Sequence, residues 1–109
     1  MNNSIREVVG SPKIFTQGIT ERVVYVIDFE PMLRDSGGTP ETPVATYLYT
    51  LADAVNQTSK LEGATALSGF LVSTSIVKDL EAGVMYRLVA EVTVGTQKFS
   101  SFKDIIGEL

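Results

Sequence analysis

The sequence contains no cysteine, no histidine and no tryptophan. Without cysteine, the chain can form no disulfide, no thiolate metal site and no cysteine nucleophile. Without histidine, it lacks the commonest general base and the commonest zinc ligand, and a serine triad built on imidazole is excluded. We therefore expect a protein that is not an enzyme and that holds neither a metal ion nor a cofactor.

Positive charge and long apolar runs are also scarce. Nine Lys and Arg residues stand against 13 Asp and Glu residues, which gives a net charge of −4, and the basic residues form no stripe. Such a surface repels a phosphate backbone. No run approaches the roughly 20 apolar residues that cross a bilayer, and the first residues do not form a signal peptide. We expect no nucleic-acid partner, no membrane association and no small-molecule substrate.

Two long segments of alternating apolar residues dominate what is present. The 109 residues are 44% hydrophobic and 20% charged, as in one globular domain. Because a β-strand places every second side chain on one face, Glu21–Phe29 and Val84–Val94 should each bury one face. The expected core residues are Val23, Tyr25, Ile27 and Phe29 in the first segment, and Val84, Tyr86, Leu88, Ala90, Val92 and Val94 in the second.

Three shorter segments are also predicted to be strands. They are Val44–Leu51, Phe70–Val77, with Ile76 on the same face as Val72, and Gln97–Lys103, which follows a two-residue turn at Gly95-Thr96. Asp53–Ala66 is expected to form a loop or a short edge strand, although a short helical turn could occupy Ala52–Val55. Strands that recur every 8–12 residues between turn signals indicate an all-β sandwich.

The sandwich is expected to span residues 19–103, between an N-terminal arm at 1–18 and a C-terminal tail at 104–109. From Phe102 onward, apolar residues recur at i, i+3, i+4 and i+7, which fits a short amphipathic helix. Gly107 weakens a helix there, so an extended tail fits the segment equally well.

A possible tyrosine corner precedes the second long strand. Leu80 is followed by a turn containing Gly83, and Tyr86 comes six residues after the leucine. In immunoglobulin-like sandwiches, a tyrosine at this corner buries its ring and hydrogen-bonds upstream backbone. The alternative is that Tyr86 is an ordinary core tyrosine. Both interpretations are structural, and neither implies a site.

Three stretches carry a resemblance to a known family. They are YVIDFEPML at residues 25–33, the A-G-x-x-Y turn at 82–86 and the V-T-V-G hairpin at 92–99. In these stretches the chain resembles small structural proteins of phages and prophages. The resemblance implies an immunoglobulin-like or fibronectin-III-like antiparallel β-sandwich of about seven strands with flexible N- and C-terminal tails. It brings no catalytic residue. The final KFSSF strand and the tail depart from the pattern, so the position in the particle stays open.

Several polar groups are candidate sites. Asp28 and Glu30 share a strand face, and we interpret them as solvated charges because neighbours on one strand do not converge across a cleft. Arg87 and Glu91 are expected to be cross-strand charge partners. A Ser–Lys dyad with one of the lysines lacks any flanking motif.

Apolar residues on outward faces are the more informative anomaly. Either they form a patch for a partner, or the N-terminal arm folds back over them. The patch requires the two long strands to be neighbours. The predicted interface residues, including those of the C-terminal segment, are Val24, Val26, Met85, Val89, Phe102, Ile105, Ile106 and Leu109.

We therefore expect a non-enzymatic structural subunit of a tailed phage or prophage particle, in the head, neck or head–tail region. Its partners would be other virion proteins and copies of itself, contacted through residues 1–18, 34–43 and 102–109. The chain would be made in the bacterial host cytoplasm and end in the virion. The alternative is a fibronectin-type accessory module that recognises carbohydrate or a cell surface, with Tyr49 and Phe102 as its candidate aromatic residues.

Overall fold

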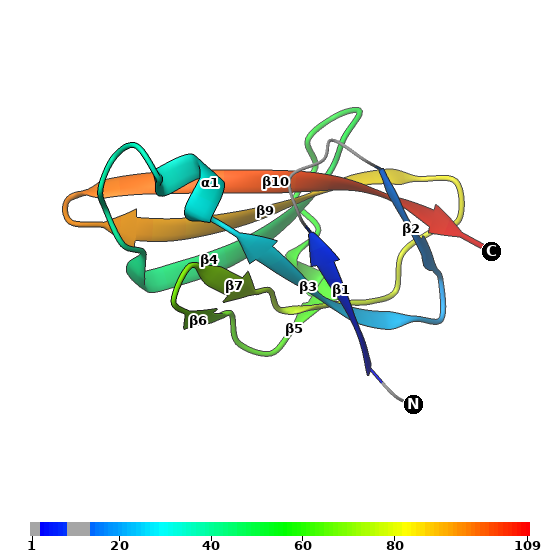
Figure 1. Ribbon diagram of the computed structural model, residues 1–109. Helices are drawn as coiled ribbons and strands as arrows, with labels where there is room; N and C mark the ends of the chain where they lie inside the picture. The colour runs from blue at the N-terminus through cyan, green and yellow to red at the C-terminus, as the bar shows by residue number, and fades with distance from the viewer. Residues whose placement is uncertain (1–2, 9–13) are drawn as a thin grey trace.

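The computed structural model describes residues 3–8 and 14–109, which form two β-sheets packed face to face (Figure 1). The chain is therefore all-β and sandwich-like, as predicted. Sheet A contains β1 (Asn3–Val8), β3 (Arg22–Asp28), β5 (Leu61–Glu62), β6 (Ala66–Ser68), β7 (Leu71–Ser73) and β8 (Ile76–Val77). Sheet B contains β2 (Phe15–Gly18), β4 (Glu41–Thr50), β9 (Met85–Val94) and β10 (Gln97–Glu108).

The two predicted long strands are confirmed as β3 and β9. Their buried and half-buried residues alternate strictly along most of each strand. The core fills the space between the sheets, since the buried faces of β3 and β9 both point inward. The buried apolar residues are Val23, Tyr25, Ile27, Phe29, Leu33, Leu48, Val72, Val77, Leu80, Tyr86, Leu88, Ala90, Val92 and Ile105.

The expected N-terminal arm is divided between the two sheets. β1 pairs in parallel with β3 in sheet A, whereas β2 pairs in parallel with β10 in sheet B. The prediction of a flexible tail at 1–18 is therefore wrong for these two strands, and β1 extends a sheet at its edge instead of covering a face. Residues 1–2 and 9–13 lie outside the described part of the chain.

The expected C-terminal tail is also part of the sandwich. β10 runs unbroken to Glu108, so both the helix and the separate tail at 104–109 are wrong. Ile105 and Gly107 are buried. A Cβ atom at position 107 would lie 2.1 Å from the Glu81 carbonyl oxygen. The glycine therefore permits a close backbone approach, whereas the sequence alone suggested a poor helix former.

The tyrosine corner predicted before β9 is confirmed by its hydrogen bond. The Tyr86 ring is fully buried, and its hydroxyl oxygen accepts a hydrogen bond of 2.9 Å from the Glu81 backbone N–H. Leu80 packs in the core, and Gly83 adopts a φ of +81° that favours glycine. The corner thus carries the chain from β8 in sheet A to β9 in sheet B.

The predicted strand Phe70–Val77 is interrupted at Thr74 and Ser75, which are both buried. The Thr74 hydroxyl accepts a 3.1 Å hydrogen bond from the Tyr25 backbone N–H, in place of a regular ladder contact. The interruption shifts the alternation by one residue, so Val77 enters the core and Ile76 does not, opposite to the prediction.

Two short helices lie outside the sheets: α1 (Glu30–Leu33) and the 3₁₀ turn η1 (Thr58–Lys60). α1 falls at the end of β3, where Pro31 occupies the first turn of a helix that the sequence analysis did not predict. Leu33 anchors this helix in the core. Within the described residues, no helix is long and apolar enough to cross a membrane.

Candidate interaction surface

The outer face of sheet B carries a continuous set of aromatic and apolar side chains. The strand register places Val89 between Tyr47 of β4 and Phe102 of β10. Two residues further along each strand, a second row joins Tyr49, Arg87 and Asp104. A third row joins Met85 to Ile106. We call this surface the aromatic face; it consists of Tyr47, Tyr49, Met85, Arg87, Val89, Phe102, Asp104 and Ile106.

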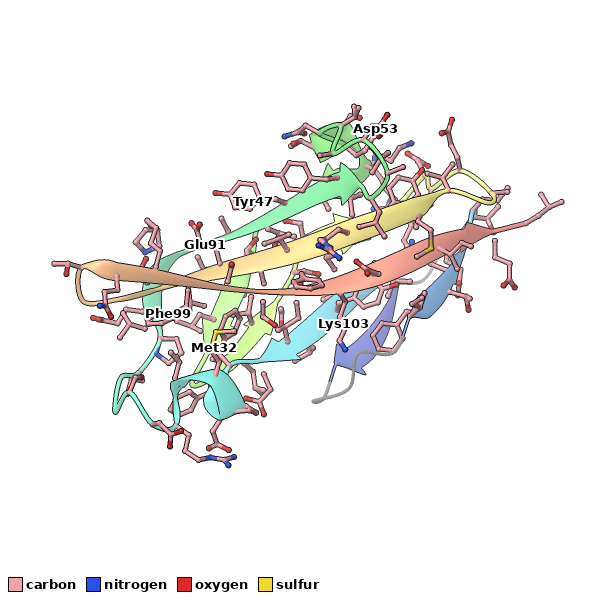
Figure 2. The ribbon with its side chains drawn as sticks, turned by 90° about the horizontal axis from the view of Figure 1, so that it is seen from above. Met32, Tyr47, Asp53, Glu91, Phe99 and Lys103 are labelled. Atoms are coloured by element: carbon pink, nitrogen blue, oxygen red, sulfur yellow. The ribbon has the colours of Figure 1, made fainter. Side chains whose placement is uncertain are left out.

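The alternation of β9 determines which side chains reach this face. Because Tyr86, Leu88, Ala90 and Val92 fill the core, the intervening residues must point away from it. On the neighbouring strand β4, the two tyrosine rings have centroids 6.5 Å apart and planes inclined by 26°. Figure 2 shows Tyr47 on the β4 side of the sheet. Phe102 is 50% exposed.

One ion pair sits among the aromatic residues. Arg87 donates two hydrogen bonds to Asp104, at 2.9 and 3.3 Å, and its guanidinium carbon lies 3.9 Å from the centroid of the Phe102 ring. The hydrogen bonds to Asp104 raise the pKa of Arg87 above its ordinary value. The two bonds fix the plane of the guanidinium over the ring, which a single contact would not do.

Arg87 and Glu91 both form cross-strand ion pairs, as expected, but with residues of β10 and not with each other. Both residues lie on β9, and each has its charged partner on β10: Asp104 for Arg87, and Lys98, at 3.8 Å, for Glu91. The lysine and both acidic residues are partly exposed, so these pairs contribute about 0–1 kcal/mol each to folding. Their main effect is on how positive and negative charges are distributed over the outer face of sheet B.

The predicted interface residues do not form one surface. Met85, Val89, Phe102 and Ile106 belong to the aromatic face, but Val24 and Val26 lie on the outer face of sheet A, on the opposite side of the sandwich. The predicted patch required β3 and β9 to be neighbours, and they belong to different sheets. Ile105 is fully buried in the core, because position 105 falls on the inner face of β10. Leu109 follows β10 and is 95% exposed.

Sequence reasoning missed the pairing of Arg87 with Asp104 and the place of Tyr47 beside Val89. The first was within reach, because counting back symmetrically from the two-residue turn at Gly95-Thr96 sets Arg87 opposite Asp104. The β4 pairing has no such local signal, since β4 and β9 are separated by more than thirty residues.

The other candidate groups have structural partners. Asp28 accepts a 2.9 Å hydrogen bond from the Glu30 backbone N–H and so supports the start of α1. The Lys78 ammonium nitrogen lies 3.1 Å from a Glu62 carboxylate oxygen. Lys103 points inward and is 9% exposed, with its ammonium 5.9 Å from the centroid of the Phe15 ring (Figure 2). Among the described residues, no three acidic side chains gather as a metal site would require.

A pocket of about 360 Å³ opens beside α1. It is formed by the helix, the glycine turn after it and the Phe70 ring. Its lining residues are Glu30, Leu33, Arg34, Gly37, Gly38, Thr39 and Phe70. The pocket includes part of the loop 34–43 that the sequence analysis expected to make contacts.

Comparison of the chain with protein-family models, with curated proteins and with solved structures found no match.

Proposed function

We propose that the sandwich is immunoglobulin-like and that the protein is a non-enzymatic structural subunit of a tailed phage or prophage particle. The fold assignment is supported by strand order. In immunoglobulin-like domains one sheet holds strands A, B, E and D and the other holds C, F and G. Here β3, the β7–β8 pair and the β5–β6 pair occupy the places of B, E and D, and β4, β9 and β10 occupy those of C, F and G. The parallel strands β1 and β2 lie outside this antiparallel correspondence. The hydrogen-bonded Tyr86 lies near the start of the F-like strand.

The aromatic face is the observation that carries the functional proposal. Tyr and Arg are the residue types that contribute most binding energy at protein–protein interfaces. Here two tyrosines, an oriented arginine and the half-exposed Phe102 share one outer face, together with aliphatic side chains. A rigid sheet presents them without the ordering cost that a loop would incur on binding. The subunit would act by protein–protein contact with other virion proteins, the class of partner that the sequence resemblance implies.

The proposal is tested in particles. The bacterial host that encodes this chain is induced, particles are purified on a density gradient, and the chain is sought by mass spectrometry. We expect the chain in the particles, and we expect incomplete particles when its gene is deleted. Absence of the chain from purified particles would refute the virion assignment.

A pair of matched variants tests the face. Phe102→Ala removes a half-exposed aromatic ring from the aromatic face, whereas Leu71→Ala removes a side chain of similar exposure (44%) from β7 in sheet A. We expect Phe102→Ala to lower incorporation into particles at least tenfold and Leu71→Ala to leave it unchanged. Equal incorporation of both variants would show that the face is not the contact.

Saccharide recognition is the second candidate function, favoured by the geometry of Tyr47 and Tyr49. Two rings inclined by only 26° and 6.5 Å apart form a platform on which a sugar chain could stack, with Arg87 and Asp104 nearby to hydrogen-bond hydroxyl groups. A glycan array tests this candidate. Binding that is lost in Tyr47→Ala would support it, and an array without any bound glycan would reject it.

A further inference from the structure

The strand β1 is held in sheet A by pairing with β3 alone among the described strands. Six consecutive residues, Asn3 to Val8, stand in parallel register with Arg22 to Ile27. Parallel neighbours cannot be joined by a tight hairpin. Between β1 and β3 the chain passes through β2, which belongs to the other sheet. No local turn therefore ties β1 to the β3 strand of its own chain.

The next strand, β2, is firmly fixed to the body of the sandwich. It pairs with the last four residues of β10. Its Gln17 is fully buried, and the amide nitrogen donates to the Val77 carbonyl at 2.8 Å while the amide oxygen accepts from the Tyr25 hydroxyl at 2.9 Å. Breaking these contacts would remove two buried hydrogen bonds, each of which contributes about 0.5–1.5 kcal/mol. β2 thus stays in place when β1 leaves.

The number of residues between the two strands sets how far β1 could extend from the fixed strand β2. Seven residue steps separate Val8 from Phe15, and at about 3.4 Å per step they span up to roughly 24 Å. This extended length exceeds the roughly 10 Å between two packed sheets.

We propose that β1 is exchanged between copies, so that residues Asn3–Val8 of one subunit pair in parallel with β3 of another. This inference rests on the proposed function, because it names a second copy as a partner in assembly. The occupant follows from the register: the β3 edge already accepts a strand of this sequence over six residues, and the same ladder forms between chains without any new interface. Reciprocal exchange closes a dimer, and head-to-tail exchange gives a ring where the rotation between subunits closes and a filament where it does not.

The absence of native cysteine makes the exchange directly measurable. Two full-length chains with different tags are co-expressed, one carrying Glu7→Cys and the other Val26→Cys, which are register partners on β1 and β3. Neighbouring strands lie about 4.8 Å apart, within the Cα separation that a disulfide spans. Under mild oxidation, a disulfide between the two tagged chains forms when β1 of one pairs with β3 of the other.

The control pair is Gly18→Cys with Glu108→Cys, which are register partners on β2 and β10 and lie outside the aromatic face. The proposal keeps this pair within one chain. We expect the mixed disulfide of the Glu7 and Val26 variants to exceed that of the control pair at least tenfold, and the double variant of one chain to give covalent dimers or larger species.

Closure of the double variant within single chains, with no excess of mixed disulfide over the control, would overturn the exchange. That result leaves the proposed function standing if the chain is found in particles. Mixed disulfides from a chain that is absent from particles would instead remove the virion assignment and keep the exchange.

Discussion

Replacing Gly107 by alanine tests whether the end of β10 is held by close contact with the corner before β9. The added Cβ would lie 2.1 Å from the Glu81 carbonyl oxygen and 2.9 Å from its carbon, whereas ordinary contacts begin near 3.4 Å. The obstacle is backbone, so no side chain can rotate away. Either β10 or the corner must move by more than an ångström.

The expected cost follows from what that movement breaks. The Gly83 N–H donates to the Gly107 carbonyl at 2.9 Å, and the Gly107 N–H donates to the Val84 carbonyl at 3.0 Å. Overpacking a close contact costs about 1–3 kcal/mol, and weakening one backbone hydrogen bond costs about 0.5–1.5 kcal/mol. We therefore expect Gly107→Ala to lower the free energy of unfolding by about 2–4 kcal/mol.

Urea denaturation measures this effect. With a slope of about 2 kcal/mol per molar urea, the midpoint should fall by roughly 1–2 M while the slope stays the same. Gly18→Ala on the adjacent strand β2 is the control, because its added Cβ meets only the flexible Glu21 side chain at 3.3 Å. We expect the control to lose less than about 1 kcal/mol. A Gly107→Ala midpoint equal to that of the parent or of the control would refute the reasoning.

Three further predictions concern the polar contacts of the sandwich. Tyr86→Phe removes the acceptor of the Glu81 N–H and should lower the free energy of unfolding by about 1–2 kcal/mol, measured by urea denaturation, with an unchanged midpoint as the contrary result. Gln17→Leu removes both buried hydrogen bonds of the amide and should cost about 1–3 kcal/mol in the same assay; a neutral effect would show that the amide is not needed. The pKa of Glu62 lies below its ordinary value, chiefly because of the hydrogen bond from Arg22 and secondarily that from Lys78. Its stabilising contribution is therefore present above about pH 4.5 and is lost as the pH falls through the lowered pKa. NMR titration of the Glu62 carboxyl should show a depressed pKa that returns toward its ordinary value in Arg22→Gln, and an identical titration curve in that variant would contradict the assignment.

The candidate surface was only partly within reach of sequence reasoning. Met85 and Val89 are predictable because apolar residues on the outward face of a strand are unusual. Phe102 and Ile106 enter the prediction only as part of the C-terminal segment at 102–109. Val24 is grouped with Met85 and Val89 by the same local rule. The rule says which residues point outward, but it does not say which of two sheets a strand joins.

The sequence by itself determined the strands β3 and β9, their buried faces, the turn at Gly95-Thr96 and the corner at Tyr86. Each depends on residues within about ten positions of one another, where side-chain alternation and turn chemistry act directly on the backbone. The tertiary structure decided the rest: the division of the N-terminal arm between two sheets, the interruption at Thr74, and the entry of Gly107 into a strand. These features arise from backbone contacts between segments far apart in the chain, which have no periodicity of their own to reveal them.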